Sequence, residues 1–359
     1  MPLGSADIER ALASWVEPAL GSDLVAAGAV RNIAVQDRQV ALALHLPFPA
    51  GRYRDELAAA LERHLHEATG TPLALDLSLE WRVESATVQQ NLQPFAGIRN
   101  IVAVASGKGG VGKSTTAANL ALALAQEGAA VGVLDADIYG PSQPRMLGVS
   151  GRPVSHDGRT MEPMRAHGVS CMSIGFLVDE EQPMVWRGPM VTQALTQLLN
   201  ETNWGELDYL IVDMPPGTGD TQLTMSQRVP LAGAVIVTTP QDIALLDARR
   251  GLQMFRKVNV NVLGLVENMG THVCSNCGHE EHIFGAGGGS RMADDYGVRL
   301  LGSLPLDIRI RAETDGGSPT VVAEPDSEIA ARYRAIARAM AAELARPRDA
   351  FPEIVEENT

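Results

Sequence analysis

A glycine-rich segment between an apolar run and a helix-forming run constrains this 359-residue chain more than any other feature. Residues 101–105 read IVAVA, residues 106–115 read SGKGGVGKST, and residues 117–124 are rich in alanine and leucine. Gly107, followed after four residues by a Gly-Lys-Ser triplet, has the P-loop spacing. Glycines let consecutive backbone N–H groups face phosphate oxygens, and the start of a helix favours negative charge. The segment predicts a strand, a phosphate-binding loop and a helix.

Most residues of this loop are predicted to contact a nucleoside triphosphate. Lys113 is expected to reach the outer phosphates, and the Ser114 hydroxyl to hold Mg²⁺. The predicted nucleotide ligands are Gly107, Gly109, Gly110, Val111, Gly112, Lys113, Ser114 and Thr115.

A dinucleotide site is the formal alternative. Gly107, Gly109 and Gly112 also satisfy G-x-G-x-x-G, and Asp135 lies near the position of a ribose-binding acid. That fingerprint has no use for a Lys-Ser pair at the helix start, whereas a triphosphate with Mg²⁺ needs both. The apolar run that ends at Asp213 also supplies a Walker-B carboxylate. We therefore favour the triphosphate.

Charge and composition exclude several classes of protein. Apolar residues make up 45% of the chain and charged residues 20%, which is ordinary globular composition. The net charge of −14 argues against binding to nucleic acid or to an anionic membrane. No apolar run approaches the ~20 residues of a membrane span, and the N-terminus resembles no signal peptide. Three cysteines are too few for a disulfide framework, so we expect a cytoplasmic protein.

The chain divides into a small domain at 1–85, a linker at 86–99 and a larger domain at 100–359. For the small domain the periodicity predicts an αββαβ order: helix 6–16, strands 32–35 and 40–46, helix 55–69 and strand 73–83. The larger domain is expected to be α/β, with a doubly wound, mostly parallel sheet that binds ligands at the carboxyl ends of its strands. Its predicted strands are 101–106, 130–135, 208–213, 233–238 and 260–266, and its predicted helices are 113–127, 189–201, 243–257 and 327–345.

Carboxylates at two strand ends complete the predicted nucleotide site. Asp137 is the candidate for activating water, Asp213 for a metal–water contact, and Asp135 for support of the metal. For Asp135 a turn-capping role is equally compatible with the sequence. Lys108 is either a solvated loop cation or a group that stabilises charge developing on the phosphates. Asn268 follows a predicted strand, and from the residues alone it indicates a turn.

A single C-x-x-C, formed by Cys274 and Cys277, indicates a redox pair, half of a metal site or a coincidence. Nearby histidines (His272, His279 and His282) make a Cys₂His₂ zinc site within one chain conceivable. Two thiolates cannot complete a tetrahedral metal site, but a two-fold dimer supplies four, enough for one 4Fe–4S cluster. The isolated Cys171 is expected to be a core residue.

Taken together, these motifs resemble the Mrp/ApbC family of P-loop ATPases that carry iron–sulfur clusters. The motifs are GKGGVGKST, DADIYGPS at 135–142, WRGP at 186–189, DMPPGTGD at 213–220, TTPQ at 238–241, ENM at 267–269, the C-x-x-C and HIFG at 282–285. The loop also resembles the deviant Walker A of SIMIBI-class ATPases. That resemblance implies a homodimer in which Lys108 reaches the partner's nucleotide. It further implies cluster ligation by Cys274 and Cys277, and Asn268 at the adenine.

The small domain resembles the MIP18-like (DUF59) domain, but residues 46–50 (LPFPA) lack the cysteine that many such domains carry there. This departure suggests a docking or regulatory module. The whole resemblance implies a slow ATPase that passes a bridging 4Fe–4S cluster from scaffold proteins to apoproteins. Two alternatives remain: a Min/Par-like positioning ATPase, disfavoured by the acidic segment 352–357, and an ATPase with a structural zinc.

Overall fold

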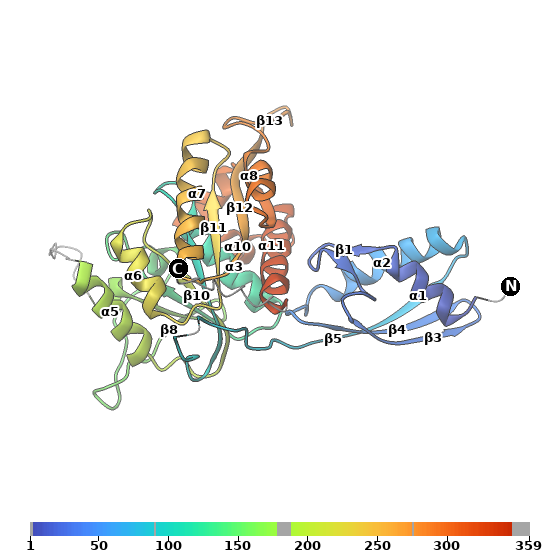
Figure 1. Cartoon of the computed structure of the whole chain (residues 1–359), viewed down its shortest axis with the longest axis horizontal. Helices are drawn as coiled ribbons and strands as arrows, with labels where there is room; N and C mark the ends of the chain where they lie inside the picture. The colour runs from blue at the N-terminus through green and yellow to red at the C-terminus, as the bar shows by residue number, and fades with distance from the viewer. Residues whose placement is uncertain (1–2, 90, 178–187, 275, 347–359) are drawn as a thin grey trace, which may run out of the picture.

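The computed structural model describes residues 3–89, 91–177, 188–274 and 276–346 of the chain. A small N-terminal α/β domain lies beside a larger α/β domain (Figure 1). Trp186 and Arg187 of the WRGP motif, and the acidic segment 352–357, lie outside the described residues.

The N-terminal domain is a three-stranded sheet with two helices. Its elements are α1 (Ser5–Ala13), β1 (Val16–Glu17), β2 (Ser22–Asp23), β3 (Val30–Gln36), β4 (Gln39–Leu46), α2 (Arg54–Thr69) and β5 (Ala74–Trp81). The sheet order is β3-β4-β5, with β3 antiparallel and β5 parallel to β4. Alternate residues of β4 are buried, as are Leu57 and Leu61 of α2, so one sheet face packs against the helices. The predicted αββαβ order is confirmed. The β1–β2 pair was missed because two-residue strands carry no periodicity.

The larger domain is built on one nine-stranded sheet. Its strands are β6 (Ile98–Ala105), β7 (Val131–Asp135), β8 (Met164–Ala166), β9 (Val169–Ser173), β10 (Leu207–Asp213), β11 (Gly233–Thr238), β12 (Val262–Val273), β13 (Glu280–Glu281) and β14 (Leu300–Pro305). The order is β13-β12-β11-β6-β10-β7-β9-β8, and β14 also pairs with β12. Only the pairs that β8 and β13 form are antiparallel, so the predicted mostly parallel sheet is confirmed.

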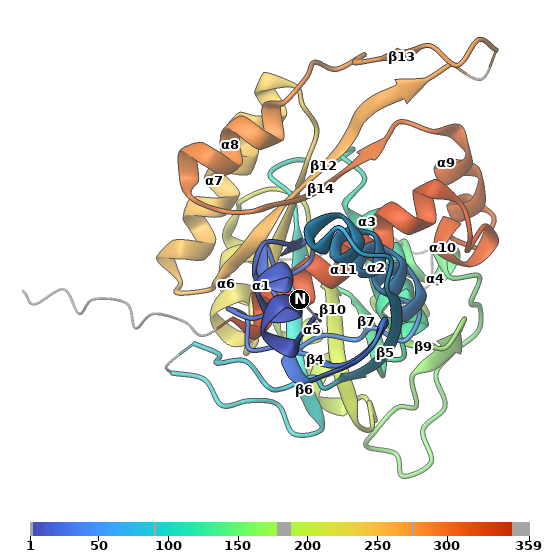
Figure 2. The same cartoon turned by 90° about the vertical axis from the view of Figure 1, so that its right-hand side faces the viewer.

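Helices cover both faces of this sheet (Figure 2). They are α3 (Lys113–Gln126), α4 (Gln143–Met146), α5 (Gly188–Glu201), α6 (Asp220–Arg228), α7 (Asp242–Lys257), α8 (Gly288–Tyr296), α9 (Ile308–Asp315), α10 (Thr320–Ala323) and α11 (Glu328–Ala345). The P-loop helix α3 contacts β6, β7, β10 and α11, and it is buried on nearly all sides. This explains its run of alanine and leucine. None of the helices in the described ranges has the length and apolarity to cross a bilayer.

The two domains are joined at the C-terminal end of α3. Glu127, the C-cap residue of α3, is fully buried. Its carbonyl accepts a hydrogen bond from Gly51 N at 2.9 Å, and its carboxylate accepts one from Arg52 N at 2.8 Å. Arg338 of α11 pairs with the same carboxylate at 2.8 Å and stacks 4.0 Å above the Tyr53 ring. The N-terminal domain therefore packs directly against one buried ion pair of the larger domain.

Replacing Arg338 with methionine should destabilise the protein strongly. The change leaves the Glu127 carboxylate buried without its cation, a loss on the order of 3–5 kcal/mol. Arg332→Met is the matched control on the same helix, since it removes an exposed pair with Glu328 worth less than about 1 kcal/mol. Urea unfolding followed by circular dichroism measures both. Equal losses in the free energy of unfolding for the two variants would contradict the assigned role of the buried Arg338–Glu127 pair.

Candidate nucleotide site and thiol pair

The P-loop lies between β6 and α3, and glycines make its path possible. Gly110 and Gly112 both adopt φ of +82°, a left-handed conformation that strains other residues. A Cβ at Gly112 would lie 2.2 Å from the side-chain nitrogen of Asn268. That nitrogen donates a hydrogen bond to the Val111 carbonyl at 2.9 Å. The strand that carries Asn268 therefore holds the P-loop directly, which the sequence did not predict.

Close packing fixes the first part of the loop as well. A Cβ at Gly107 would lie 2.2 Å from the backbone of Asp247 in α7, so only glycine fits there. The Gly217 N–H donates to the Ser106 carbonyl at 3.0 Å, which brings the loop after β10 onto the P-loop. The segment that begins at the predicted site residue Asp213 therefore lies against the phosphate-binding loop.

A buried cation lies at the centre of the site. Lys113 is only 6% exposed, and its ammonium forms an ion pair with Asp213. It also donates to the Ser114 hydroxyl at 3.1 Å and lies 3.9 Å from the Asp137 carboxylate. These four side chains, all predicted as site residues, are therefore brought together at the carboxyl ends of β7 and β10.

Gln143, the first residue of α4, is a site residue that sequence reasoning missed. Its side-chain nitrogen donates to Asp213 Oδ2 at 2.8 Å and to the Ser114 carbonyl at 3.0 Å. Its side-chain oxygen is buried and has no hydrogen-bond partner among the described residues. The signal available in the sequence was a polar residue directly after the DADIYGPS loop.

Asp135 is fully buried, and its carboxylate accepts four hydrogen bonds from the protein. The donors are Asp137 N at 3.2 Å, Ser142 N at 2.9 Å, Gln143 N at 3.0 Å and the Ser173 hydroxyl at 3.1 Å. These hydrogen bonds to Asp135 fix the loop between β7 and α4, and thereby position both Asp137 and Gln143.

Burial dominates the titration of the two loop carboxylates. It raises the pKa of Asp135 to about 7, and the neighbouring Asp213 carboxylate adds to the rise. Burial also raises the pKa of Asp137, although the Lys113 ammonium opposes that shift. A carboxylate with a raised pKa is a better proton acceptor at neutral pH.

Lys108 and its neighbours form the outward side of the loop. The Lys108 side chain is half-buried and forms no ion pair with the described residues, while Gly109 and Gly110 are exposed. Thr115 is half-buried in the first turn of α3. The ammonium of Lys108 is thus left available to a group from outside the chain.

The two candidate thiols lie apart from this site, beyond the sheet edge. Strand β12 continues past Asn268 and pairs with β13, which forms a hairpin that extends from the sheet (Figures 1 and 2). Cys274 N donates to the His279 carbonyl at 2.9 Å, so the hairpin closes around the C-x-x-C. Cys274 is half-buried and Cys277 is exposed.

The surroundings of Cys274 favour its thiolate. Backbone N–H groups of Asn276 and Cys277 lower the pKa of this thiol, followed by the Cys277 side chain and His272. No three His, Cys, Asp or Glu side chains in the described ranges group closely enough to hold a metal ion. Nδ1 of His272 lies 3.0 Å from the Leu306 carbonyl, and Nδ1 of His282 lies 2.8 Å from the Gly270 carbonyl. The predicted core position of Cys171 is confirmed, since it is fully buried.

Two family models match the chain. The ParA model, described as NUBPL iron-transfer P-loop NTPase, matches residues 97–341. The chain belongs to this family. The iron-sulfur cluster assembly protein model matches residues 5–71, in agreement with the MIP18-like resemblance.

Relatives and solved structures agree with this assignment. The chain is 51% identical to an iron-sulfur cluster carrier protein of Escherichia coli K12 over 93% of this chain and 90% of the relative. It is 54% identical to mouse iron-sulfur cluster transfer protein NUBPL, over 68% of this chain and 77% of the relative. A nucleotide-binding protein from Archaeoglobus fulgidus in complex with ADP is 38% identical with a TM-score of 0.57, covering 65% of this chain and 90% of that one. The MinD ATPase of Pyrococcus furiosus, 24% identical with a TM-score of 0.51 over 67% of this chain and 98% of that one, shares the fold.

Replacing Gly112 with alanine should damage the P-loop. The added Cβ collides with the Asn268 side chain and requires a strained φ, an effect on the order of 1–3 kcal/mol. Gly109→Ala is the matched control, because nothing lies within 4 Å of its added Cβ. We expect a lower thermal unfolding midpoint for the first variant only. A similar midpoint for both would show that the close approach does not constrain the loop.

The raised pKa of Asp135 predicts a pH dependence of stability. The folded protein holds this proton up to a pH of about 7, whereas an unfolded aspartate releases it near ~4. The stabilising contribution of the group is therefore complete below ~4 and is lost as the pH rises through 7. Without nucleotide or Mg²⁺, the free energy of unfolding of the wild type should fall relative to that of Asp135→Asn over this window. A pH-independent difference would contradict the prediction.

Proposed function

We propose that this chain is an ATP-dependent iron–sulfur cluster carrier that acts as a homodimer. The observation that carries the proposal is the thiol pair of half-buried Cys274 and exposed Cys277, which offers two ligands on a hairpin outside the nucleotide site. Family membership and the names of the relatives support the same cargo.

The residues at the nucleotide site fit ATP with Mg²⁺. Gly109, Gly110 and the start of α3 offer backbone N–H groups, and Asn268 lies beside the loop as a candidate for the adenine. The unpartnered buried oxygen of Gln143, next to the Asp213 carboxylate, suits water molecules held by a cation. Mg²⁺, when bound, would neutralise phosphate charge. We propose that Ser114 holds it directly and Asp213 through water, with Asp135 in support.

The remaining side chains have distinct proposed roles in slow ATP hydrolysis. Asp137 accepts the proton of the attacking water, a role that its raised pKa favours. Lys113 gives up part of its contact with Asp213 and neutralises the outer phosphates. Lys108, unpaired within the described part of the chain, reaches the nucleotide of the partner subunit.

The cluster is the cargo of this proposed carrier. Each chain offers two thiols, so a two-fold dimer provides the four that a 4Fe–4S cluster takes. Apoproteins are the proposed recipients and assembly scaffolds the donors. Thiolates and clusters survive in a reducing compartment, which supports a cytoplasmic location.

The two alternatives have less support. A zinc site within one chain needs further ligands near the thiols, and none groups with them among the described residues. A Min/Par-like positioning role rests on the fold that the chain shares with MinD. The net charge of −14 opposes attachment to DNA or to anionic lipid.

Anaerobic reconstitution with iron and sulfide tests the cargo. We expect about four irons and four sulfides per dimer, with visible absorbance of a cluster, and loss of both in Cys274→Ala and Cys277→Ala. Cys171→Ala is the matched control, because that thiol is buried in the core. Tightly held zinc without a cluster, or normal loading of the Cys277 variant, would contradict the proposal.

A further inference from the structure

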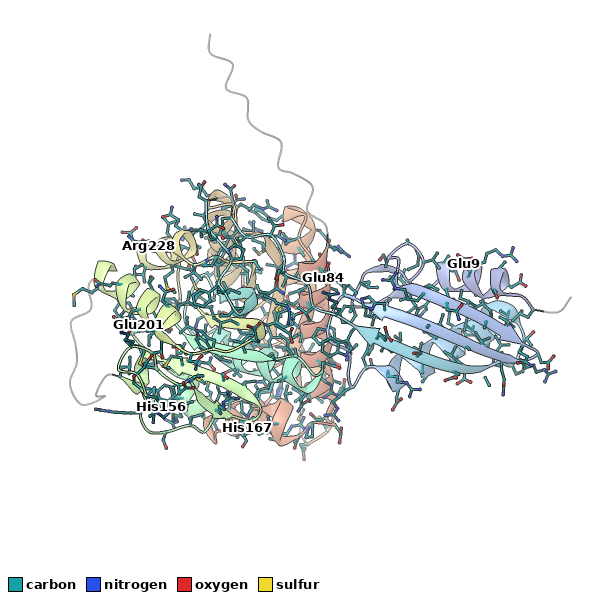
Figure 3. All side chains as sticks on the ribbon, turned by 90° about the horizontal axis from the view of Figure 1, so that it is seen from below. Glu9, Glu84, His156, His167, Glu201 and Arg228 are labelled. Atoms are coloured by element: carbon teal, nitrogen blue, oxygen red, sulfur yellow. The ribbon has the colours of Figure 1, made fainter. Side chains whose placement is uncertain are left out.

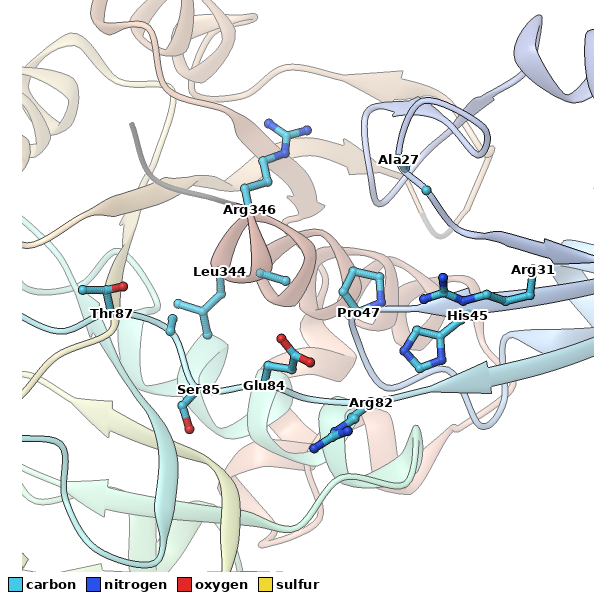
Figure 4. A pocket seen from close by; sticks show the side chains of 13 residues that line it. Ala27, Arg31, His45, Pro47, Arg82, Glu84, Ser85, Thr87, Leu344 and Arg346 are labelled. Carbon is cyan, nitrogen blue, oxygen red and sulfur yellow. The ribbon is translucent and has the colours of Figure 1, made fainter. Parts of the chain in front are cut away.

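A cleft of about 380 Å³ lies between the two domains and is separate from both the nucleotide site and the thiols. Arg31 and His45 lie next to one another on the N-terminal sheet, and Arg82 and Glu84 follow along the segment that leaves β5 (Figure 4). The end of α11, at Leu344 and Arg346, forms the facing wall. Figure 3 places Glu84 at the junction of the domains.

The described residues that line this cleft carry a positive net charge, whereas the whole molecule is negatively charged. The chain carries a net charge of −14, yet among the described residues that line the cleft Glu84 is the single carboxylate. Arg31 and Arg82 are exposed, and neither forms an ion pair with the described residues. His45, between them, adds a half-buried ring. Two guanidiniums without an ion-pair partner among the described residues therefore line one cleft of a protein whose net charge is negative.

Contacts across the domain junction keep the cleft formed. The Arg346 guanidinium donates to the Leu20 carbonyl and pairs with Glu343 at 2.9 Å. Arg299 reaches the carbonyls of Pro18 and Ala19 from the larger domain. The cations of the N-terminal sheet and the wall from α11 thus keep one relative position, so a ligand would meet a prepared surface.

We propose that this cleft binds an acidic polypeptide segment of a partner protein, whose carboxylates pair with Arg31 and Arg82. The negative charge of Glu84 repels a compact polyanion at the centre of the cleft. Carboxylates spaced along an extended chain can instead pair with each arginine separately. Pro47 and Leu344 add apolar contact beside these charges. This inference goes beyond the proposed carrier function, since it concerns neither nucleotide nor cluster.

Fluorescence anisotropy of the full chain with a labelled peptide of alternating glutamate and glycine tests the proposal. At low ionic strength we expect binding, with no binding of the glutamine counterpart. Arg31→Gln combined with Arg82→Gln should weaken binding by roughly tenfold. Arg63→Gln, on the exposed side of α2, is the matched control and should leave the affinity unchanged. Equal affinity for the glutamine peptide, or equal binding by the double variant, would overturn the proposal.

A second variant identifies the occupant. Glu353, Glu356 and Glu357 belong to an acidic segment of the same chain. If changing these three to glutamine raises the affinity for the peptide by tenfold or more, the cleft serves that segment and not a partner, and the proposal fails. Unchanged affinity supports a partner protein. Neither iron nor nucleotide enters these measurements, so their failure leaves the proposed function untouched.

Discussion

The burial of the Lys113 charge is the constraint on which the nucleotide site depends. An ammonium that is 6% exposed must be compensated, and Asp213 and Asp137 provide the negative charge. Because these carboxylates follow different strands, the parallel register of β7 and β10 is what brings them to one cation. Gln143 then donates to Oδ2 of Asp213, the oxygen that does not pair with Lys113, and ties α4 to the same cluster. The start of α4 is therefore bonded to the same carboxylate that compensates the charge of the P-loop lysine.

Strand β12 contacts the P-loop and continues into the hairpin that carries the thiols. Asn268 contacts the P-loop, and the same strand runs on to the hairpin that carries Cys274. Met269, the residue between contact and hairpin, has a left-handed φ of +59°. Glu267, just before, accepts a hydrogen bond from Gly289 N at 2.6 Å, so the strand is anchored to α8 at this point. The P-loop contact and the start of the thiol hairpin therefore lie on one continuous strand.

Local patterns predicted most of the fold, and the P-loop spacing predicted the centre of the site. Continuous apolar runs identified β6, β7, β10 and β11 because a covered parallel sheet requires them. The extension of β12 beyond residue 266 escaped prediction, since its outer half is polar and half-exposed. Gln143 and Arg338 were not predicted for another reason. Each is a buried polar residue whose partner is distant in sequence, and no hydrophobic periodicity indicates such pairs. From the residues alone Asn268 indicated a turn, and its hydrogen bond to the Val111 carbonyl could not be predicted because the two residues are distant in sequence.

The buried ion pair at the domain junction lies entirely within the larger domain. Glu127 and Arg338 form this ion pair, and their charges neutralise each other. If the N-terminal domain were absent, this pair would become a hydrated surface salt bridge and no buried charge would be orphaned. The junction also lies at the end of α3 opposite the P-loop. The N-terminal domain thus contacts α3 at its C-terminal end, and the phosphate-binding end of that helix is left to the larger domain.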